Sequence, residues 1–259
     1  MRGVSGSLWE LSTMLCRPRR IGLTLVELLV VIGMAAIVIA VLLPALGTAR
    51  RQARTLLCLS NLRQLDTGLE LYLAQNQGQS PEYVYSNSQC WMQLIQPFSS
   101  NLSSIGLCPE AAEPSFGWGS ATRSWGPNVF NHQGSYTLNG WLYRYDIDDP
   151  QKLWGAEYGP HDAYFKLPGT VTPRVPTFCD GVWVDAWPSG SDEPPADLQG
   201  TAEQNVSQMG RVCIDRHRQA INVVFLDGHG ETVPLAELWQ LQWSATFKSA
   251  DVVLPSVRH

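Results

Sequence analysis

The hydrophobic pattern changes its period along the chain and thereby divides the sequence into parts. Ile21–Leu46 is an apolar run of 26 residues in which Glu27 is the one ionisable side chain. A helix needs about 20 apolar residues to cross the hydrocarbon core of a bilayer, so this run predicts a membrane span. Arg17, Arg19 and Arg20 precede the run, and basic flanking residues stay on the cytoplasmic side. The remainder of the chain is therefore expected across the membrane.

From Gly47 to Gln77 the apolar residues recur at steps of three and four, which is the period of an amphipathic helix. The stripe consists of Leu56, Leu59, Leu62, Leu65, Leu69 and Tyr72. We expect one long helix from about Leu23 to Asn76, with Gly78 as its stop. We interpret the stripe as packing on a globular head; a coiled coil over Leu56–Leu73 is the alternative.

Beyond Gly78 the pattern favours short strands and turns. Ala220–Leu226 and Glu231–Pro234 flank Asp227-Gly228, a dipeptide suited to a tight hairpin turn. Further strands are expected near Tyr136–Leu138, Val175–Phe178 and Val182–Val184, and short helices at Ser88–Pro97 and Leu235–Leu241. The expected fold class is α+β: a long N-terminal helix packed on a small antiparallel β-sheet head with long aromatic, glycine-rich loops.

Glu27 is the anomaly in the apolar run. A carboxylate inside an apolar membrane helix costs roughly 2.5–3.5 kcal/mol on insertion scales and is usually kept for a partner or a function. The residues around it, Arg19-Arg20-Ile21-Gly22 followed by Leu23-Thr24-Leu25-Val26-Glu27, resemble the N-terminus of type IV prepilins and type II secretion pseudopilins. In that family a peptidase cuts after the glycine, and the fifth mature residue is Glu. Pro44 falls at mature position 22, where these helices also carry a proline.

The resemblance implies cleavage after Gly22 and N-methylation of Leu23, although the family usually begins its mature chain with Phe. The domains expected are a leader over residues 1–22, a helix over 23–77 that spans the membrane at about 23–46, and a periplasmic head over 78–259. The new amine of Leu23 can neutralise Glu27 of a neighbouring subunit, which removes two charges from a low-dielectric setting. Pro44 removes a backbone donor and is expected to kink the helix or release it locally.

The function implied by the resemblance is that of a structural subunit of a pseudopilus or pilus-like filament, not an enzyme. The expected location is the inner membrane, crossed once, with the N-terminus cytoplasmic and the head periplasmic. The implied partners are a prepilin peptidase, sibling pilin or pseudopilin subunits, an inner-membrane assembly platform with its ATPase, and membrane lipid. A monomeric, membrane-anchored binding module with a ligand-capturing aromatic head is the alternative.

A second motif lies near the C-terminus. His217, nine further residues and Asp227-Gly228 resemble the processing-associated motif of a bacterial subgroup of prepilin-like proteins, as do the residues on both sides, Cys213–Arg218 and Asn222–Trp239. The strand between them is expected to carry His217 and Asp227 to opposite ends, so a direct catalytic pair is not expected.

Charge and composition exclude some classes of function. The chain has 259 residues and a net charge of −5, and the leader holds four arginines and one glutamate, so its removal leaves −8. A chain that acidic is a poor nucleic-acid binder, because neutralising phosphates dominates such affinity. About 180 residues beyond the helix are enough for one sizeable domain.

Scattered histidine and carboxylate residues are the candidates for an enzyme or metal site. Histidine and carboxylate residues that could converge are His132, His161, His217, His229, Asp180, Asp185 and Asp227. No HExxH, GxSxG or GxxxxGK[ST] pattern is present, so we expect hydrogen-bonded structural histidines, no catalytic residues and no metal ligands among them. Calcium at the Asp146, Asp148 and Asp149 loop is a weaker possibility than a solvated turn.

Cysteine and tryptophan usage leaves further alternatives open. Cys58, Cys90, Cys108, Cys179 and Cys213 follow the leader. Five is an odd number, so at least one stays free or pairs between chains; Cys90 with Cys108 and Cys179 with Cys213 are conceivable disulfides. The ten tryptophans fit a core better than a carbohydrate-binding face.

Overall fold

The computed structural model describes residues 24–82, 90–99, 101–127, 131–144, 160–167, 174–201 and 207–255. The chain divides into two compact units, Met1–Thr48 and Ala49–His259. One helix, α1, spans Leu25–Gln75 and so supplies residues to both units. Gly22 and Leu23 lie outside the described residues.

The first unit contains the apolar part of α1. Every described side chain from Thr24 to Leu46 is exposed, and α1 is the one described helix long and apolar enough to cross a membrane. Thr24 caps the helix: its hydroxyl accepts a hydrogen bond from the Glu27 N–H at 3.2 Å, and its own N–H donates to Glu27 Oε2 at 2.8 Å. This reciprocal pair is a capping box, which satisfies backbone donors that a helix start leaves unpaired.

Pro44 does not interrupt α1. The residues on both sides of it stay helical, and the kink or local release expected from the sequence stays a prediction. The Thr48 hydroxyl donates to the Pro44 carbonyl at 3.2 Å. This side-chain hydrogen bond adds to the backbone contacts of the turn that follows Pro44. The Pro44 nitrogen itself cannot donate a helical hydrogen bond.

The second half of α1 packs on the head, as the amphipathic interpretation predicted. Its buried residues are Cys58, Leu59, Asn61, Leu62, Leu65, Asp66, Gly68 and Leu69. The assignment of Leu56 to the stripe was wrong, because this side chain is 66% exposed. The buried stripe begins with Cys58 instead. The helix ends at Gln75, where Gln77 and Gly78 adopt positive φ and the Gly78 N–H donates to the Leu73 carbonyl.

The head is built on a five-stranded sheet with the order β3-β1-β2-β4-β5. The strands are β1 Tyr136–Asn139, β2 Pro176–Asp180, β3 Asp185–Ala186, β4 Ala220–Phe225 and β5 Gly230–Pro234. Neighbours are antiparallel except β1 and β3, which run parallel, so the sheet is mixed and not antiparallel throughout as expected. The strand expected at Val182–Val184 is a bend, and pairing starts only at Asp185.

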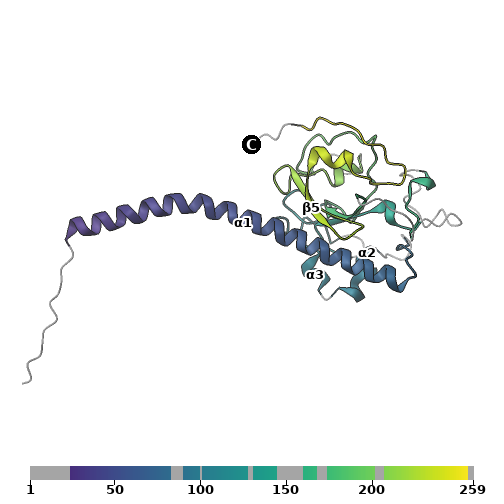
Figure 1. The fold of residues 1–259 in the computed structure, drawn as a ribbon, viewed down its shortest axis with the longest axis horizontal. Coiled ribbons are helices and arrows are strands. Elements are labelled where there is room, and N and C mark those ends of the chain that lie inside the picture. The colour runs from purple at the N-terminus through teal and green to yellow at the C-terminus, as the bar shows by residue number, and fades with distance from the viewer. Residues whose placement is uncertain are drawn as a thin grey trace, which may run out of the picture. The chain divides into compact units, whose positions relative to one another are not determined.

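β4 lies between β2 and the edge strand β5, and apart from Asn222 its sequence, AINVVF, is apolar. All six residues are buried. The Asn222 side chain donates to the Thr55 carbonyl of α1, so the Asn222 side of β4 faces α1 and the alternate residues face the opposite side. Figure 1 draws the second half of α1 along one side of the sheet and the yellow C-terminal segment on the other.

Short helical elements complete the head. They are α2 Trp91–Ile95, the 3₁₀ helix η2 Gln96–Phe98, α3 Leu102–Ile105 and the 3₁₀ helices η3 Gly140–Leu142, η6 His161–Ala163, η7 Met209–Arg211 and η8 Leu235–Gln240. The helices expected at Ser88–Pro97 and Leu235–Leu241 correspond to α2 with η2 and to η8. The hydrophobic core is rich in tryptophan: six of the eight described tryptophans are buried.

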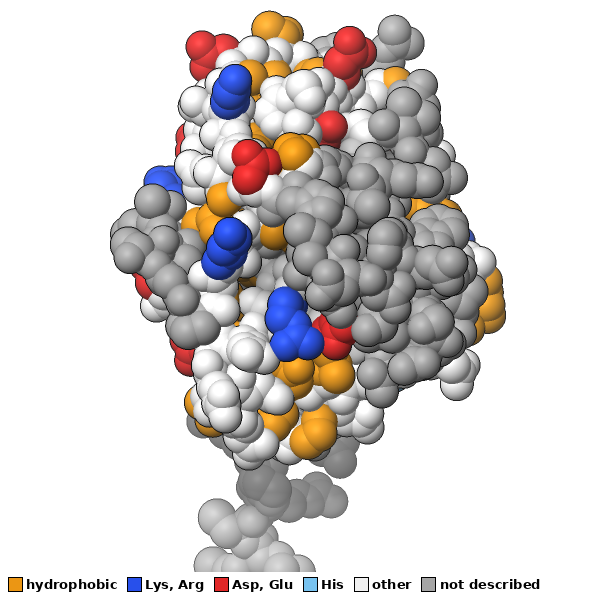
Figure 2. All heavy atoms as spheres, turned by 90° about the vertical axis from the view of Figure 1, so that its right-hand side faces the viewer, with side chains coloured by type: hydrophobic (Ala, Val, Ile, Leu, Met, Phe, Trp, Pro, Cys, Tyr) orange, Lys and Arg blue, Asp and Glu red, His pale blue; other side chains and the backbone are white. Residues whose placement is uncertain are grey.

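The head surface carries charges of both signs. Figure 2 shows one face of the molecule, on which the described lysine and arginine side chains are scattered among aspartate and glutamate. The described part of this face therefore presents no patch of a single charge.

Asp66 is a buried acid where α1 meets the sheet. Its side chain accepts a hydrogen bond from the Thr177 hydroxyl of β2 at 2.7 Å. Burial raises the pKa of Asp66 from 3.8 to about 7, with the charges of Glu70 and Asp227 adding to the rise and the Thr177 hydrogen bond opposing it. The folded state therefore holds a proton there that the unfolded chain loses near pH 4.

We predict that Asp66→Asn reduces the pH dependence of stability between pH 4 and 7. In the wild type the folded state binds more protons than the unfolded state over this window, so stability falls as pH rises, by on the order of 3 kcal/mol at most. Urea unfolding of wild type and variant in detergent at pH 4.5, 5.5 and 7 measures the difference. The exposed Asp251→Asn variant is the control; parallel pH curves for wild type and Asp66→Asn would contradict the prediction.

Candidate functional site: a buried cysteine, aspartate and histidine cluster

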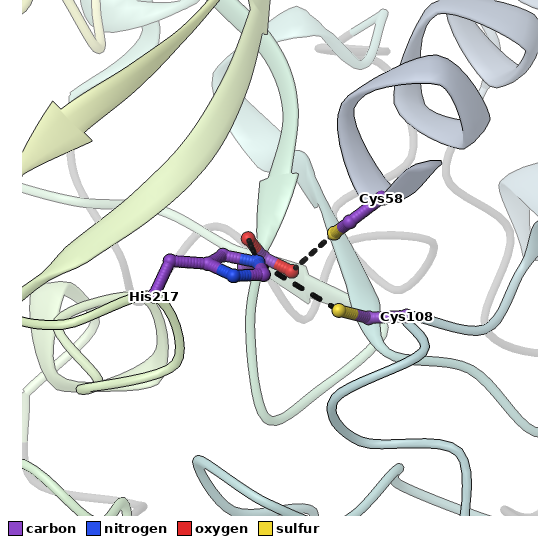
Figure 3. Close-up of side chains that lie close together, drawn as sticks. Cys58, Cys108 and His217 are labelled. Atoms are coloured by element: carbon purple, nitrogen blue, oxygen red, sulfur yellow. Dashed lines mark hydrogen bonds and ion pairs between the residues drawn. The ribbon is translucent and has the colours of Figure 1, made fainter. Parts of the chain in front are cut away.

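The second unit encloses a cluster of four side chains that bear metal-binding or nucleophilic atoms. They are Cys58, Cys108, Asp180 and His217, all buried, and one ligand atom of each lies within 4.8 Å of those of the others. The two thiols and the imidazole point toward one another from three separate segments (Figure 3). The cluster is thus formed by the tertiary fold and not by any local motif.

Each side chain reaches the cluster for a local reason. Cys58 begins the buried stripe of α1. Cys108 lies after α3 in a turn closed by the Ala111 N–H donating to its carbonyl at 2.9 Å. Asp180 is the last residue of β2, followed by Gly181, where a Cβ atom would clash with the Thr137 hydroxyl oxygen. Only glycine allows the chain to leave β2 so close to β1.

His217 is positioned by the tight turn that leads into β4. Its N–H donates to the Ala220 carbonyl at 3.0 Å. Arg218 and Gln219 between them both adopt positive φ, which is uncommon for residues other than glycine. The turn aims the ring into the head, while the next side chain, Arg218, is exposed.

The distances within the cluster are those of direct contacts. His217 Nε2 lies 3.2 Å from Asp180 Oδ2 and 3.7 Å from Cys108 Sγ. Cys58 Sγ lies 3.3 Å from Asp180 Oδ1. The Tyr136 hydroxyl of β1 donates to Cys58 Sγ at 3.3 Å, so the sulfur has a further polar neighbour.

The other ring nitrogen of His217 faces α1. Nδ1 lies 3.2 Å from the Thr55 hydroxyl, and this hydroxyl donates its proton to the Arg51 carbonyl at 3.2 Å. The hydroxyl oxygen therefore accepts a hydrogen bond from Nδ1–H. In the neutral ring this leaves the lone pair of Nε2 directed at Cys108 and Asp180.

Arg216 supplies the buried positive charge beside the cluster. Its side chain is fully buried and contacts Asp180 Oδ1 at 3.3 Å. The remaining donors of the guanidinium bond four backbone carbonyls, those of Ser120, Ala121, Ser135 and Gly181. Asp180 Oδ2 also accepts from the Asn222 N–H of β4 at 2.8 Å. The carboxylate is thus compensated from both sides, as a buried charge requires.

These neighbours shift the pKa values of the cluster. Burial disfavours ionisation of Asp180, but the charge and hydrogen bond of His217 and the charge of Arg216 outweigh it and lower the pKa of Asp180. Burial likewise opposes the charge on His217, yet Asp180 raises the pKa of this histidine to about 10. Without any other ligand, Asp180 and His217 therefore form an ion pair at neutral pH.

The two thiols respond in opposite directions. Burial raises the pKa of Cys58 well above its ordinary value, and its hydrogen bond to Cys108 adds to the rise. For Cys108, burial is outweighed by hydrogen bonds from Cys58 and His217 and by the charge of Arg216, which lower its pKa to about 7. Cys108 is therefore the thiol that ionises first, and a thiolate is the form that binds metals.

The residues singled out from the sequence are distributed over the molecule. His217 is in the cluster, whereas Asp227 and Gly228 lie beyond the other end of β4, so histidine and Asp-Gly occupy opposite ends of the strand as expected. Asp227 contacts His229 within the turn, and Gly228 has a φ of +81°. This turn meets α1, because a Cβ atom at Gly228 would lie 3.6 Å from Glu70 Oε1.

Other predicted residues lie elsewhere. Glu27 and Pro44 belong to the first unit. Asp185 pairs with Arg211 at 3.9 Å, and Tyr143 donates to it at 3.4 Å, away from the cluster residues. The side chain of His161 and the acidic loop Asp146–Asp149 are outside the described residues, as are Gly22 and Leu23.

The two conceivable disulfides are not formed. Cys58, Cys90, Cys108, Cys179 and Cys213 are all free thiols. Pairing Cys90 with Cys108 was wrong because the fold places Cys108 beside Cys58 and His217. Pairing Cys179 with Cys213 was wrong too; Cys179 instead directs its thiol to the Thr137 carbonyl of β1 at 3.9 Å.

Two members of the cluster, His217 and Asp180, are among the residues that could converge on the basis of sequence, whereas Cys58 and Cys108 were missed. Its four members are spread from residue 58 to residue 217, and no short ligand spacing marks them. One signal was present: Cys58 continues the leucine stripe toward the N-terminus, four residues before Leu62. Asp180 closes an apolar strand that leads into the head.

Comparisons with protein-family models, with curated proteins and with solved structures find no match.

We predict that Arg216→Met destabilises the head by at least about 3 kcal/mol, because it leaves the Asp180 carboxylate and four carbonyls without their buried donor. Urea unfolding in detergent measures the loss. Arg218→Ala, in the exposed neighbour, is the matched control and should change stability by less than about 0.5 kcal/mol. Equal effects of the two variants would show that Arg216 does not compensate the cluster.

Proposed function

We propose that the protein is a filament subunit of the pilin or pseudopilin type, held in the membrane by the first part of α1 and assembled through that same segment. The observation that supports this most strongly is a continuous 51-residue helix whose N-terminal part is apolar and exposed while its C-terminal part is packed into a folded head. A surface of this apolarity needs lipid or other helices as its environment.

Glu27 gives the proposal its mechanism. The carboxylate is bound to the first turn of its own helix through Thr24, so it enters the apolar phase with part of its hydrogen-bonding capacity satisfied. A carboxylate has about four lone-pair sites, which leaves sites for an amine of a neighbouring subunit. Cleavage after Gly22 would supply that amine at Leu23, and the ion pair between subunits would set their axial register.

The proposed partners follow from this mechanism. A membrane peptidase removes the leader, sibling subunits pack against the helix, and an inner-membrane platform with its ATPase extracts the subunit toward the periplasmic side. The head is carried on the outside of the filament. Type II secretion or a related envelope machine is the proposed setting.

The alternative, a monomeric binding module, has less support. Six of the eight described tryptophans are buried, so most of the described tryptophans serve the core and not a ligand face. The pocket that includes Trp141, Ser189 and Phe247 has a volume of about 200 Å³. Ligand sites for small molecules usually measure about 300–1,000 Å³.

We predict that Glu27→Gln abolishes incorporation into filaments while leaving leader removal intact. A glutamine side chain can still accept the capping hydrogen bond from the Thr24 N–H, but it carries no charge. Thr24→Ala, which keeps the charge and removes the capping hydroxyl, should still assemble. Cross-linking and shearing of filaments measure incorporation, and N-terminal mass spectrometry of protein from native membranes should find Leu23 as the first residue.

Two outcomes would overturn the proposal. A mature chain that starts at any residue other than Leu23 removes the source of the amine. A Glu27→Gln variant that assembles like the wild type shows that the charge has no part in assembly. If Thr24→Ala fails and Glu27→Gln does not, the cap and not the ion pair is what assembly needs.

A further inference from the structure

We propose that Cys58, Cys108, Asp180 and His217 bind one Zn²⁺ ion, which fastens α1 to the head. The site is independent of filament assembly, since all four residues belong to the second unit. The donor set contains two sulfur atoms, one imidazole nitrogen and one carboxylate oxygen. Sulfur and nitrogen donors select zinc over calcium and magnesium, which prefer oxygen alone.

The separations of the donor atoms fit a tetrahedral ion. Bonds of about 2.0–2.3 Å place the ligands of tetrahedral zinc roughly 3.3–3.8 Å apart. The contacts from His217 Nε2 to Cys108 Sγ at 3.7 Å, from Cys58 Sγ to Asp180 Oδ1 at 3.3 Å and from His217 Nε2 to Asp180 Oδ2 at 3.2 Å are close to this range. Cys58 and His217 contact different oxygens of Asp180, and one donor atom of each residue lies within 4.8 Å of those of the others, so side-chain rotation is needed to bring four donors onto one ion.

The outer contacts support the same role. Thr55 fixes His217 from Nδ1 and leaves Nε2 to the metal, and metal-bound histidines usually have such a partner on the other nitrogen. Asp180 keeps a hydrogen bond on each oxygen, from Arg216 on Oδ1 and from the Asn222 N–H on Oδ2. Whichever oxygen binds the ion, the other oxygen keeps its hydrogen bond to Arg216 or to the Asn222 N–H.

The charges also balance. Two thiolates and one carboxylate carry three negative charges, the ion carries two positive charges, and the fully buried Arg216 carries one. The buried assembly is then neutral, which a low-dielectric interior favours. This balance accounts for an arginine enclosed next to the cluster.

The site is structural in kind, because four protein ligands fill the coordination of zinc and leave no position for a substrate. The ligands come from α1, from the turn after α3, from the end of β2 and from the turn before β4. One ion would therefore tie the long helix to three segments of the head. The histidine of the C-terminal motif becomes, on this account, a metal ligand.

The test uses the full chain purified in detergent, without chelator, and measures metal content by mass spectrometry. We expect about one zinc ion per chain. Replacement by Co²⁺ should give the sulfur-to-cobalt charge-transfer absorption and the intense visible bands of tetrahedral coordination. Both readouts are made on the wild type, so they do not depend on whether a variant folds.

Variants assign the ligands. Cys108→Ser and His217→Gln should each lose the zinc and the cobalt spectrum, whereas Cys213→Ser, at a buried thiol outside the cluster, should keep both. Thr55→Val, which removes the hydroxyl that positions His217, should weaken zinc binding about 10- to 100-fold in competition with a chelating dye. A purely structural role of Thr55 would lower stability without this change in affinity.

Several results would overturn the site. One is that the purified wild-type protein contains no zinc and binds no Co²⁺ after its thiols have been reduced. Another is a Cys58–Cys108 disulfide in peptide maps of unreduced protein from native membranes, which would make the pair a covalent link and not a ligand pair. A third is zinc that remains bound in both Cys108→Ser and His217→Gln.

Discussion

The head is organised around the buried carboxylate of Asp180, whose negative charge is balanced by groups from neighbouring segments. This residue ends β2, and its two oxygens contact partners from three other segments: the Cys58 thiol on α1, His217 and Arg216 before β4, and the Asn222 N–H in β4. An unpaired carboxylate at this depth would cost several kcal/mol, so each partner stabilises the folded head. The same demand fixes the position of α1 along the sheet, because Cys58 and Thr55 meet the cluster only at that point of the helix.

This arrangement suggests a structural role for the C-terminal motif, His217 with Asp227-Gly228. β4 lies between His217 and the Asp227-Gly228 turn, and both ends meet α1: His217 contacts Thr55, and the turn lies near Glu70 and influences Asp66. A fixed spacing of nine residues keeps the two contacts at a constant separation along the strand. The motif therefore aligns a strand with a helix at two points, which explains why its histidine and aspartate do not need to touch each other.

Sequence reasoning predicted the parts of this fold that depend on local periodicity. The long helix, its stop near Gly78 and the β4–β5 hairpin all follow from patterns contained within a few turns or a few residues. The parallel pairing of β1 with β3 and the exposure of Leu56 did not follow, because they depend on which neighbour each element meets. For the same reason His217 and Asp180 were named among several residues that could converge, whereas Cys58 and Cys108 were not recognised as their companions.

The capping box at Thr24 has a consequence for how α1 would behave in a bilayer. A bare carboxylate there would pull water or headgroups toward it and thin the membrane locally. With the acid folded back onto its own first turn, the helix would disturb the lipid less. Glu27, which is proposed to bind the next subunit, would thus also disturb the bilayer less around a single chain, because its carboxylate is capped by Thr24.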